Sequence, residues 1–238
     1  MLARNRLFIA LPVFFVACVF DAPASLFTLA LPPQIQIKNV QGTIWNGRAS
    51  ALGVGTIVVQ EHVEWRLNPL AMLTGRMEWL LTGWYGKRSS TLSVRLGVDG
   101  MELQNVNIYL PLEPFAALHS RLNSLGLGAT LHASAQRLGV QQRSRATLDV
   151  DGLFFVQLPQ SGQLGSYQLE LDADESGSGK WGLRSLSGIV AATGHGTFST
   201  KRFQFNGQLT LNPHSPLPGL SAVLSRQPGN DAGYQVSF

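Results

Sequence analysis

The chain has 238 residues, of which 13% are charged and 25 are glycine, and its formal net charge is +4. A hydrophobic content of 45% excludes an intrinsically disordered protein, because disorder requires few apolar residues and a high charge. The lysines and arginines are scattered and form no basic tract, which argues against nucleic-acid binding. The single cysteine, Cys18, excludes an internal disulfide and a cysteine-based metal site.

The N-terminal part of the chain has the composition of a membrane anchor. Arg4 and Arg6 precede an apolar stretch over residues 7–31 in which Asp21 is the one charge. A span needs about 20 apolar residues, and positive residues before it stay in the cytoplasm. We therefore expect residues 1–31 to form a single-pass transmembrane helix in the cell inner membrane, with a cytoplasmic N-terminus and a periplasmic domain after it.

Two alternatives fit the same segment. Residues 22–24, Ala-Pro-Ala, have the small residues of a signal-peptide cleavage site, and Cys18 ends a loose match to a lipoprotein signal. All three interpretations send residue 34 onward across the inner membrane, so each places the remaining chain in the periplasm.

The next part of the chain has the period of half-buried β-strands. Polar and apolar residues alternate in several segments, among them residues 34–38, 57–67, 89–98 and 165–173. Glycine-rich and polar turns separate these segments. We therefore predict a mainly β domain over residues 32–211, built as a curved antiparallel sheet that meanders from strand to strand.

One or two short helices are expected to interrupt the strands. Asn68 can cap a helix whose first position is Pro69 and whose end is Gly75. Apolar residues at helical spacing predict a second short helix within residues 111–124, covering one end of the sheet. Near the C-terminus, several prolines disfavour regular structure, so residues 212–238 are predicted to form an irregular tail.

The most distinctive stretch is Gly-Thr-Ile-Trp-Asn-Gly-Arg-Ala over residues 42–49. It reads as a strand that ends at the pair Asn46 and Gly47, a dipeptide typical of tight hairpin turns. The next strand contains Trp65, and we expect Trp45 and Trp65 to lie on one face of the sheet. Because burying a tryptophan removes on the order of 150–250 Å² from water, this pair is the expected nucleus of the core.

The strand predicted over residues 77–84 is unusually apolar, with Trp79, Leu80, Leu81 and Trp84. A central strand that is buried on both faces is the favoured interpretation, because a large exposed apolar patch is rare on a monomer. The alternative is a strand whose outer face meets a membrane or a partner. For that alternative we nominate Trp79, Leu81 and Trp84 as the candidate partner or lipid face.

No residue pattern indicates catalysis, a metal or a cofactor. The five histidines do not have the spacing of a zinc motif, and we find no Gly-x-Ser-x-Gly nucleophile motif. No glycine-rich phosphate loop precedes a helix, and the acidic residues are too sparse to indicate a catalytic pair of carboxylates. We therefore expect a protein that is not an enzyme, with no metal and no cofactor.

The distinctive stretch and the segment after it carry a family resemblance. Residues 42–49, then Val-Glu-Trp-Arg-Leu-Asn-Pro-Leu over residues 63–70 and a Leu-x-Gly ending at Gly75, resemble protein N of the bacterial type II secretion system, the GspN family. The specific matches lie within residues 39–75, while the layout is similar over nearly the whole chain. The motif residues, which look structural, are Gly42, Thr43, Trp45, Asn46, Gly47, Trp65 and Pro69.

This resemblance implies a non-enzymatic accessory component of the secretion machine, bound to the inner membrane, whose periplasmic β domain acts as a scaffold or assembly factor. The implied partners are other secretion components, in the inner-membrane platform or the outer-membrane channel. The GspN family is also similar, more distantly, to AsmA-like proteins, whose curved sheets present an apolar groove to lipid. That similarity implies the alternative function, lipid binding or lipid transfer in the cell envelope.

Overall fold

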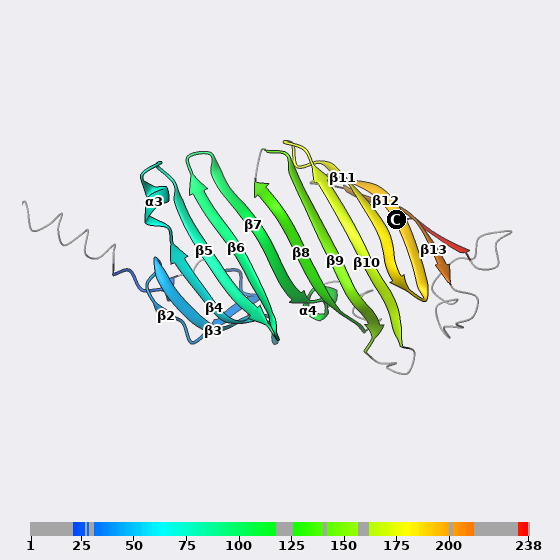
Figure 1. The fold of residues 1–238 in the computed structure, drawn as a ribbon, viewed down its shortest axis with the longest axis horizontal. Helices are drawn as coiled ribbons and strands as arrows, with labels where there is room; N and C mark the ends of the chain where they lie inside the picture. The colour runs from blue at the N-terminus through cyan, green and yellow to red at the C-terminus, as the bar shows by residue number, and fades with distance from the viewer. Residues whose placement is uncertain are drawn as a thin grey trace, which may run out of the picture.

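The computed structural model describes residues 21–26, 28, 31–117, 126–139, 142–156, 162–199, 202–211 and 233–237. In this part of the chain, fourteen strands form one antiparallel sheet (Figure 1). From β3 onward each strand pairs with the next strand in sequence, and β1 and β2 both pair with β3. The prediction of a mainly β meander is therefore confirmed.

The strands follow one another closely along the chain. Their bounds are β1 Ile35–Lys38, β2 Gln41–Gly42, β3 Asn46–Val54, β4 Ile57–Leu67, β5 Met77–Tyr85, β6 Arg88–Gly97, β7 Gly100–Pro111, β8 Leu127–Gly139, β9 Ser144–Phe155, β10 Gln163–Ala173, β11 Gly179–Gly188, β12 Val190–Ser199, β13 Arg202–Leu211 and β14 Gly233–Ser237. Most connections are short turns, so neighbouring strands in the sequence become neighbours in the sheet.

Within the described residues, two short helices interrupt the meander. Helix α3, Pro69–Met72, lies between β4 and β5, and helix α4, Glu113–Ala116, follows β7. Asn68 caps α3 as predicted, because its Oδ1 accepts a hydrogen bond of 3.1 Å from the backbone N–H of Leu70. None of the helices in the described residues could cross a membrane, and residues 1–20, which hold most of the predicted anchor, lie outside them.

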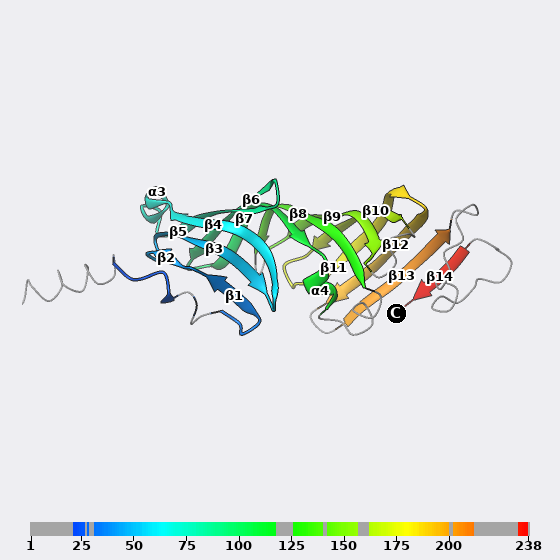
Figure 2. The ribbon, with the colours of Figure 1, turned by 90° about the horizontal axis from the view of Figure 1, so that it is seen from below.

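The sheet is a single curved layer. Figure 2 shows the strands arching, with α4 beneath the arch. Curvature brings the side chains on the concave side closer together. The burial along β12 agrees with this: alternate residues from Val190 to Phe198 are buried or half-buried, and the residues between them are exposed. Because no second layer packs against the described strands, no large side chain among them is completely buried.

The concave face is apolar across several strands. Direct cross-strand pairs join Ala133 of β8, Leu148 of β9, Leu169 of β10 and Leu183 of β11. A neighbouring row contains the buried side chains of Leu131 and Tyr167 on either side of Val150. The intervening residues, which face the convex side, are mostly polar. This alternation is the pattern expected of a sheet that has one shielded face.

Two expectations differ from the structure. Strand β5 is central in the sheet, but it is not buried on both faces, because Leu80 and Trp84 are exposed on the convex side. Irregular structure was expected over residues 212–238, whereas β14, Gly233–Ser237, pairs with β13. The free edge of β13 offers unpaired backbone groups, and the segment 233–237 has no proline, so it can add to the sheet. Residues 212–232 lie outside the described residues.

Candidate functional site

The Gly-Thr-Ile-Trp-Asn-Gly motif forms a tight loop between β2 and β3. Gly42 pairs with Gly47 across the loop. The backbone N–H of Thr43 donates to the carbonyl of Asn46 at 2.9 Å, and its Oγ1 accepts from the backbone N–H groups of Trp45 and Asn46. The turn therefore precedes Asn46, and the Asn46–Gly47 pair begins β3 instead of forming the turn that the dipeptide predicts. The Thr43 hydroxyl, which satisfies two backbone donors, explains this shift.

Two tryptophans hold this loop from neighbouring strands. The indole Nε1 of Trp65 in β4 donates to the carbonyl of Thr43, and that of Trp79 in β5 donates to the carbonyl of Ile44, each at 3.0 Å. Trp45 stacks on Trp79, with ring centroids 6.4 Å apart and planes at 9°. Trp65 is in the core, as expected, but Trp45 lies in the loop and not on a strand.

The two glycines of the motif lie where a side chain has no room. Gly42 has a φ of +90°, which favours glycine. A Cβ on Gly47 would lie 2.4 Å from the Cζ2 atom of Trp65. The Gly47 position therefore lets the Trp65 ring lie flat against the backbone of β3, and both residues are required for this packing.

The residues that precede the sheet attach to the same loop. Ile44 donates a backbone hydrogen bond to Ala22, and Ala24 donates one to Gly42, each at 3.0 Å. Ala24 is buried against Trp65 and Ala49. The chain therefore enters the sheet at the motif loop, and the motif organises a small core that joins the N-terminal segment to the first strands.

Pro69 begins the corner between β4 and β5. It occupies the first turn of α3, where its missing N–H leaves no helical hydrogen bond unmade. The preceding Asn68 caps this helix and also donates through Nδ2 to a carboxylate oxygen of Glu78 at 3.0 Å. Gly75 ends the corner with a φ of +73°. The matched residues from 68 to 75 thus fix a change of chain direction.

The three residues nominated as a partner or lipid face do not share a surface. Trp79 and Leu81 lie on the concave side, where they pack against the core around Trp65. Trp84 lies on the convex side and is exposed, as is Leu80. The reason is the two-residue period of a strand, which sends residues 79 and 81 to one face and residue 84 to the other. The exposed apolar pair on β5 is therefore Leu80 and Trp84.

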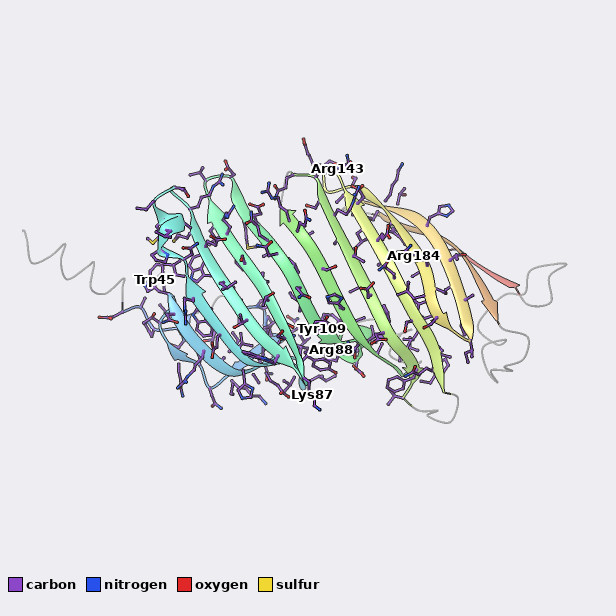
Figure 3. The ribbon with its side chains drawn as sticks, in the orientation of Figure 1. Trp45, Lys87, Arg88, Tyr109, Arg143 and Arg184 are labelled. Carbon is purple, nitrogen blue, oxygen red and sulfur yellow. The ribbon has the colours of Figure 1, made fainter. Side chains whose placement is uncertain are left out.

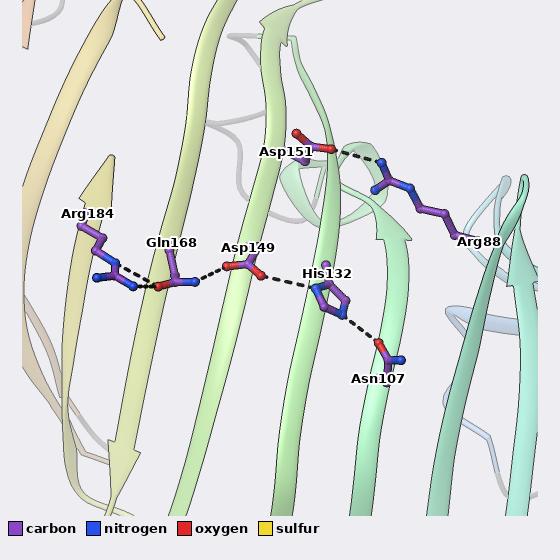
Figure 4. Close-up of polar contacts among 7 residues, drawn as sticks. All are labelled: Arg88, Asn107, His132, Asp149, Asp151, Gln168 and Arg184. Carbon is purple, nitrogen blue, oxygen red and sulfur yellow. Dashed lines mark hydrogen bonds and ion pairs between the residues drawn. The ribbon is translucent and has the colours of Figure 1, made fainter. Parts of the chain in front are cut away.

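A row of polar side chains crosses the convex face (Figure 4). The Nε of Arg184 donates to Oε1 of Gln168 at 2.9 Å, and Nε2 of Gln168 donates to Oδ1 of Asp149 at 2.7 Å. The other oxygen of Asp149 lies 3.3 Å from Nδ1 of His132, whose Nε2 lies 2.7 Å from Oδ1 of Asn107. From His132 to Arg184 the members of the row are direct cross-strand partners on β8, β9, β10 and β11. Asn107 of β7 is a diagonal neighbour of His132, because its direct partner is Ser134.

Aromatic and basic side chains extend this polar row. The His132 ring stacks on Tyr109 with centroids 4.4 Å apart, and the guanidinium of Arg88 lies 5.2 Å from the centre of the Tyr109 ring. Arg88 also pairs with Asp151 at 3.2 Å (Figure 4). These side chains contact one another across strands and do not converge on a cleft. Among the described residues, no three His, Cys, Asp or Glu side chains are arranged to hold a metal.

An acidic side chain between two arginines lies near one end of the strands. Asp172 of β10 accepts hydrogen bonds from Arg143 at 3.1 Å and from Arg145 of β9 at 3.0 Å. These hydrogen bonds lower the pKa of Asp172 from 3.8 to about 2. Sequence analysis did not identify this cluster or the polar row, because both depend on the register between strands.

The family comparison accounts for this architecture. A family model described as type II secretion system (T2SS), protein N matches residues 33–236. The chain belongs to this family. The match begins just before β1 and ends within β14, so the protein N family relationship covers the whole sheet and not only the motif loop.

Membership of the protein N family assigns this chain an accessory role in type II secretion, with other components of that system as its partners. The family that the motif resembled is therefore confirmed. Comparison with curated proteins and with solved structures found no match.

Proposed function

We propose that this protein is a non-enzymatic component of the type II secretion system that acts as a scaffold or assembly factor. In this proposal residues 1–31 anchor it in the inner membrane, with the N-terminus in the cytoplasm and the sheet in the periplasm. The observation that carries the proposal is the match of the protein N family to the whole sheet. The convex polar row supports it, because its side chains contact one another across an open surface and not within an enclosed cleft.

Two surfaces suit contact with another secretion component. Strand β1 pairs on one side with β3, and within the described residues its other side has no neighbouring strand, so it offers an edge to which a partner strand can add. On the convex face, Leu80 and Trp84 are exposed apolar side chains on one strand. Aromatic side chains are enriched at the centres of protein interfaces, so this pair is the better candidate for an anchoring contact.

Photocrosslinking in cells tests this proposal. A photoreactive residue at Leu80 or Trp84 should crosslink a component of the secretion system. The matched control is Leu81, which lies on the same strand and faces the concave side, and it should not give the same product. If neither the convex positions nor Gln36 on β1 yields a secretion component, the scaffold proposal is wrong.

The membrane orientation has a separate test. A phosphatase that is active in the periplasm alone should be active when fused after residue 238 and inactive when fused before residue 1. The opposite pattern would overturn the proposed topology without affecting the crosslinking result.

The concave face favours a second function, which is binding of lipid acyl chains. Ala133, Leu148, Leu169 and Leu183 form a continuous apolar row over four strands. A surface of this kind loses free energy when it is covered by hydrocarbon. Mass spectrometry of an organic extract from the purified protein would detect bound phospholipid. Leu169→Gln should release that lipid, whereas Thr193→Gln on the convex face should not. Protein free of lipid that still captures secretion components would favour the scaffold.

A further inference from the structure

Two neighbouring loops at one end of the strands have exposed apolar tips. In the loop that contains α3, Leu70 is 71% exposed to solvent and Leu73 is 84% exposed. In the β6–β7 hairpin, Val98 is 98% exposed. An ion pair of 3.2 Å between Arg76 and Asp99 holds the two loops together. The methionines at the bases of these loops are also exposed: Met72, Met77 and Met101.

Two other described turns contrast with this pair. At the opposite end of the same strands, the β5–β6 turn carries Gly86 and Lys87 (Figure 3). At the same end but farther along the sheet, the β10–β11 turn carries Asp174, Glu175 and Ser176. The apolar tips therefore gather at one corner of the molecule, where α3 and the β6–β7 hairpin lie side by side (Figure 1).

The shape of this corner suits a lipid surface. Helix α3 has no buried residue, and its Leu70 and the following Leu73 project into solvent. A protein partner would need a matching cavity for such projections, whereas the interface of a bilayer accepts apolar side chains on a convex surface. Transfer of the exposed apolar groups at these tips out of water lowers their free energy.

The entry point of the chain lies beside this corner. Ala22 accepts a hydrogen bond from Ile44, and the carbonyl of Ile44 accepts one from Trp79. Trp79 pairs directly with Leu67, the last residue of β4 before the α3 loop. The described chain at Ala22 therefore lies close to the strand ends that carry the apolar tips, and residues 1–20, expected to hold most of the anchor, precede it in the sequence.

We propose that Leu70, Leu73 and Val98 insert into the interfacial layer of the bilayer that contains the N-terminal anchor. This inference rests on the proposed function, of which the anchor is a part. Three inserted side chains and one anchor make separate contacts with the membrane, and together they fix the orientation of the sheet. The first strands then lie at the membrane surface, and the polar β10–β11 turn does not touch it.

Depth-dependent quenching in vesicles tests the insertion. The full chain with Cys18→Ser is reconstituted into phospholipid vesicles, and an environment-sensitive fluorophore is attached to Leu73→Cys or Val98→Cys. Phospholipids with brominated acyl chains should quench both labels and shift their emission to shorter wavelength. Labels on Lys87→Cys, at the opposite strand end, and on Ser176→Cys, at the polar turn, should show neither change.

The outcomes separate this inference from the proposed function. A chain that floats with the vesicles but whose tip labels are not quenched overturns the insertion and leaves the anchor intact. A chain that does not float overturns both the anchor and the insertion. Tip labels that are shielded only in cells containing the secretion system, and not in vesicles, overturn the insertion in favour of a protein partner. Because the labels at Leu73 and Val98 are read separately, misfolding of one variant does not prevent the test.

Discussion

The indole Nε1 of Trp65 donates a hydrogen bond of 3.0 Å to the carbonyl oxygen of Thr43. This bond joins the two parts of the family motif, and the Trp65 side chain is only 6% exposed. We predict that Trp65→Phe lowers the free energy of unfolding by about 1 kcal/mol, because it removes the donor but keeps an aromatic ring. Trp65→Ala should cost about 3–5 kcal/mol, because it also removes buried area. Urea denaturation followed by circular dichroism measures both values.

The control for this prediction is Trp84, which is exposed on the convex face. Trp84→Phe should change the free energy of unfolding by no more than about 0.5 kcal/mol, as expected for a surface position. Equal effects of Trp65→Phe and Trp84→Phe would show that the motif hydrogen bond does not stabilise the fold.

The close approach of Gly47 to Trp65 gives a second prediction. In Gly47→Ala the new Cβ would lie 2.4 Å from the Trp65 ring and 2.6 Å from the carbonyl oxygen of Gln41, so the ring or the strand must move. We expect a loss of about 1–3 kcal/mol in the free energy of unfolding. Gly182→Ala is the matched strand control, since a Cβ there meets no atom within 4 Å. If both variants unfold at the same urea concentration, the packing argument fails.

The third prediction concerns Tyr167 at high pH. Burial raises the pKa of its phenol from 10.0 to about 12, and its hydroxyl donates to the carbonyl of Val190 at 2.9 Å. Below pH 10 both folded and unfolded states hold the proton, so the full stabilisation is present. Above pH 10 the unfolded state loses the phenol proton first. Up to pH 12 this group should therefore lower the free energy of unfolding by about 1.4 kcal/mol per pH unit.

Comparison with Tyr167→Phe isolates this contribution. The variant should be less stable near neutral pH by about 1 kcal/mol, because it lacks the hydrogen bond to Val190. Between pH 10 and pH 12 its free energy of unfolding should fall less steeply than that of the unmodified chain. Parallel pH profiles for the two proteins would contradict the raised pKa of this phenol.

The fourth prediction concerns the acidic pH range and Asp172. Its pKa is about 2, below the ordinary value of 3.8, so its contribution to stability is present above about pH 4 and is lost as the pH falls toward 2. Carboxyl chemical shifts in an NMR titration should report this low pKa. Arg143→Gln or Arg145→Gln should each raise it, because each removes a hydrogen-bond donor to the carboxylate. Arg184→Gln, which changes a residue of the polar row, should leave it unchanged.

Local chemistry allowed part of this fold to be predicted from the sequence. The α3 corner was predictable because Asn68, Pro69 and Gly75 each satisfy a requirement of a short helix within a few residues. The strands were predictable from their alternation. The turn at the motif was misplaced by one to two residues, because the Thr43 hydroxyl competes with the Asn46–Gly47 pair for the turn position.

The features that sequence analysis missed depend on register. Register shifts occur between β4 and β5 and between β6 and β7, near His62 and Asn105, whose φ angles are +49° and +50°. Each shift changes which residues face each other across strands, and no local sequence pattern predicts it. The polar row through His132 and the Asp172 cluster depend in the same way on the register of other pairs, from β7 to β11. The β14 pairing likewise depends on a free edge that only the assembled sheet provides.

The consecutive strand order bears on how the chain acquires its structure. Among the described strands other than β1, each one pairs with the strand that immediately precedes or follows it in the sequence. Loop-closure entropy is small for such local pairings, so each hairpin can form as soon as both of its strands have been synthesised. Growth from the motif loop toward β14 then needs no distant segment to arrive first, so the early hairpins do not depend on the late ones for their partners.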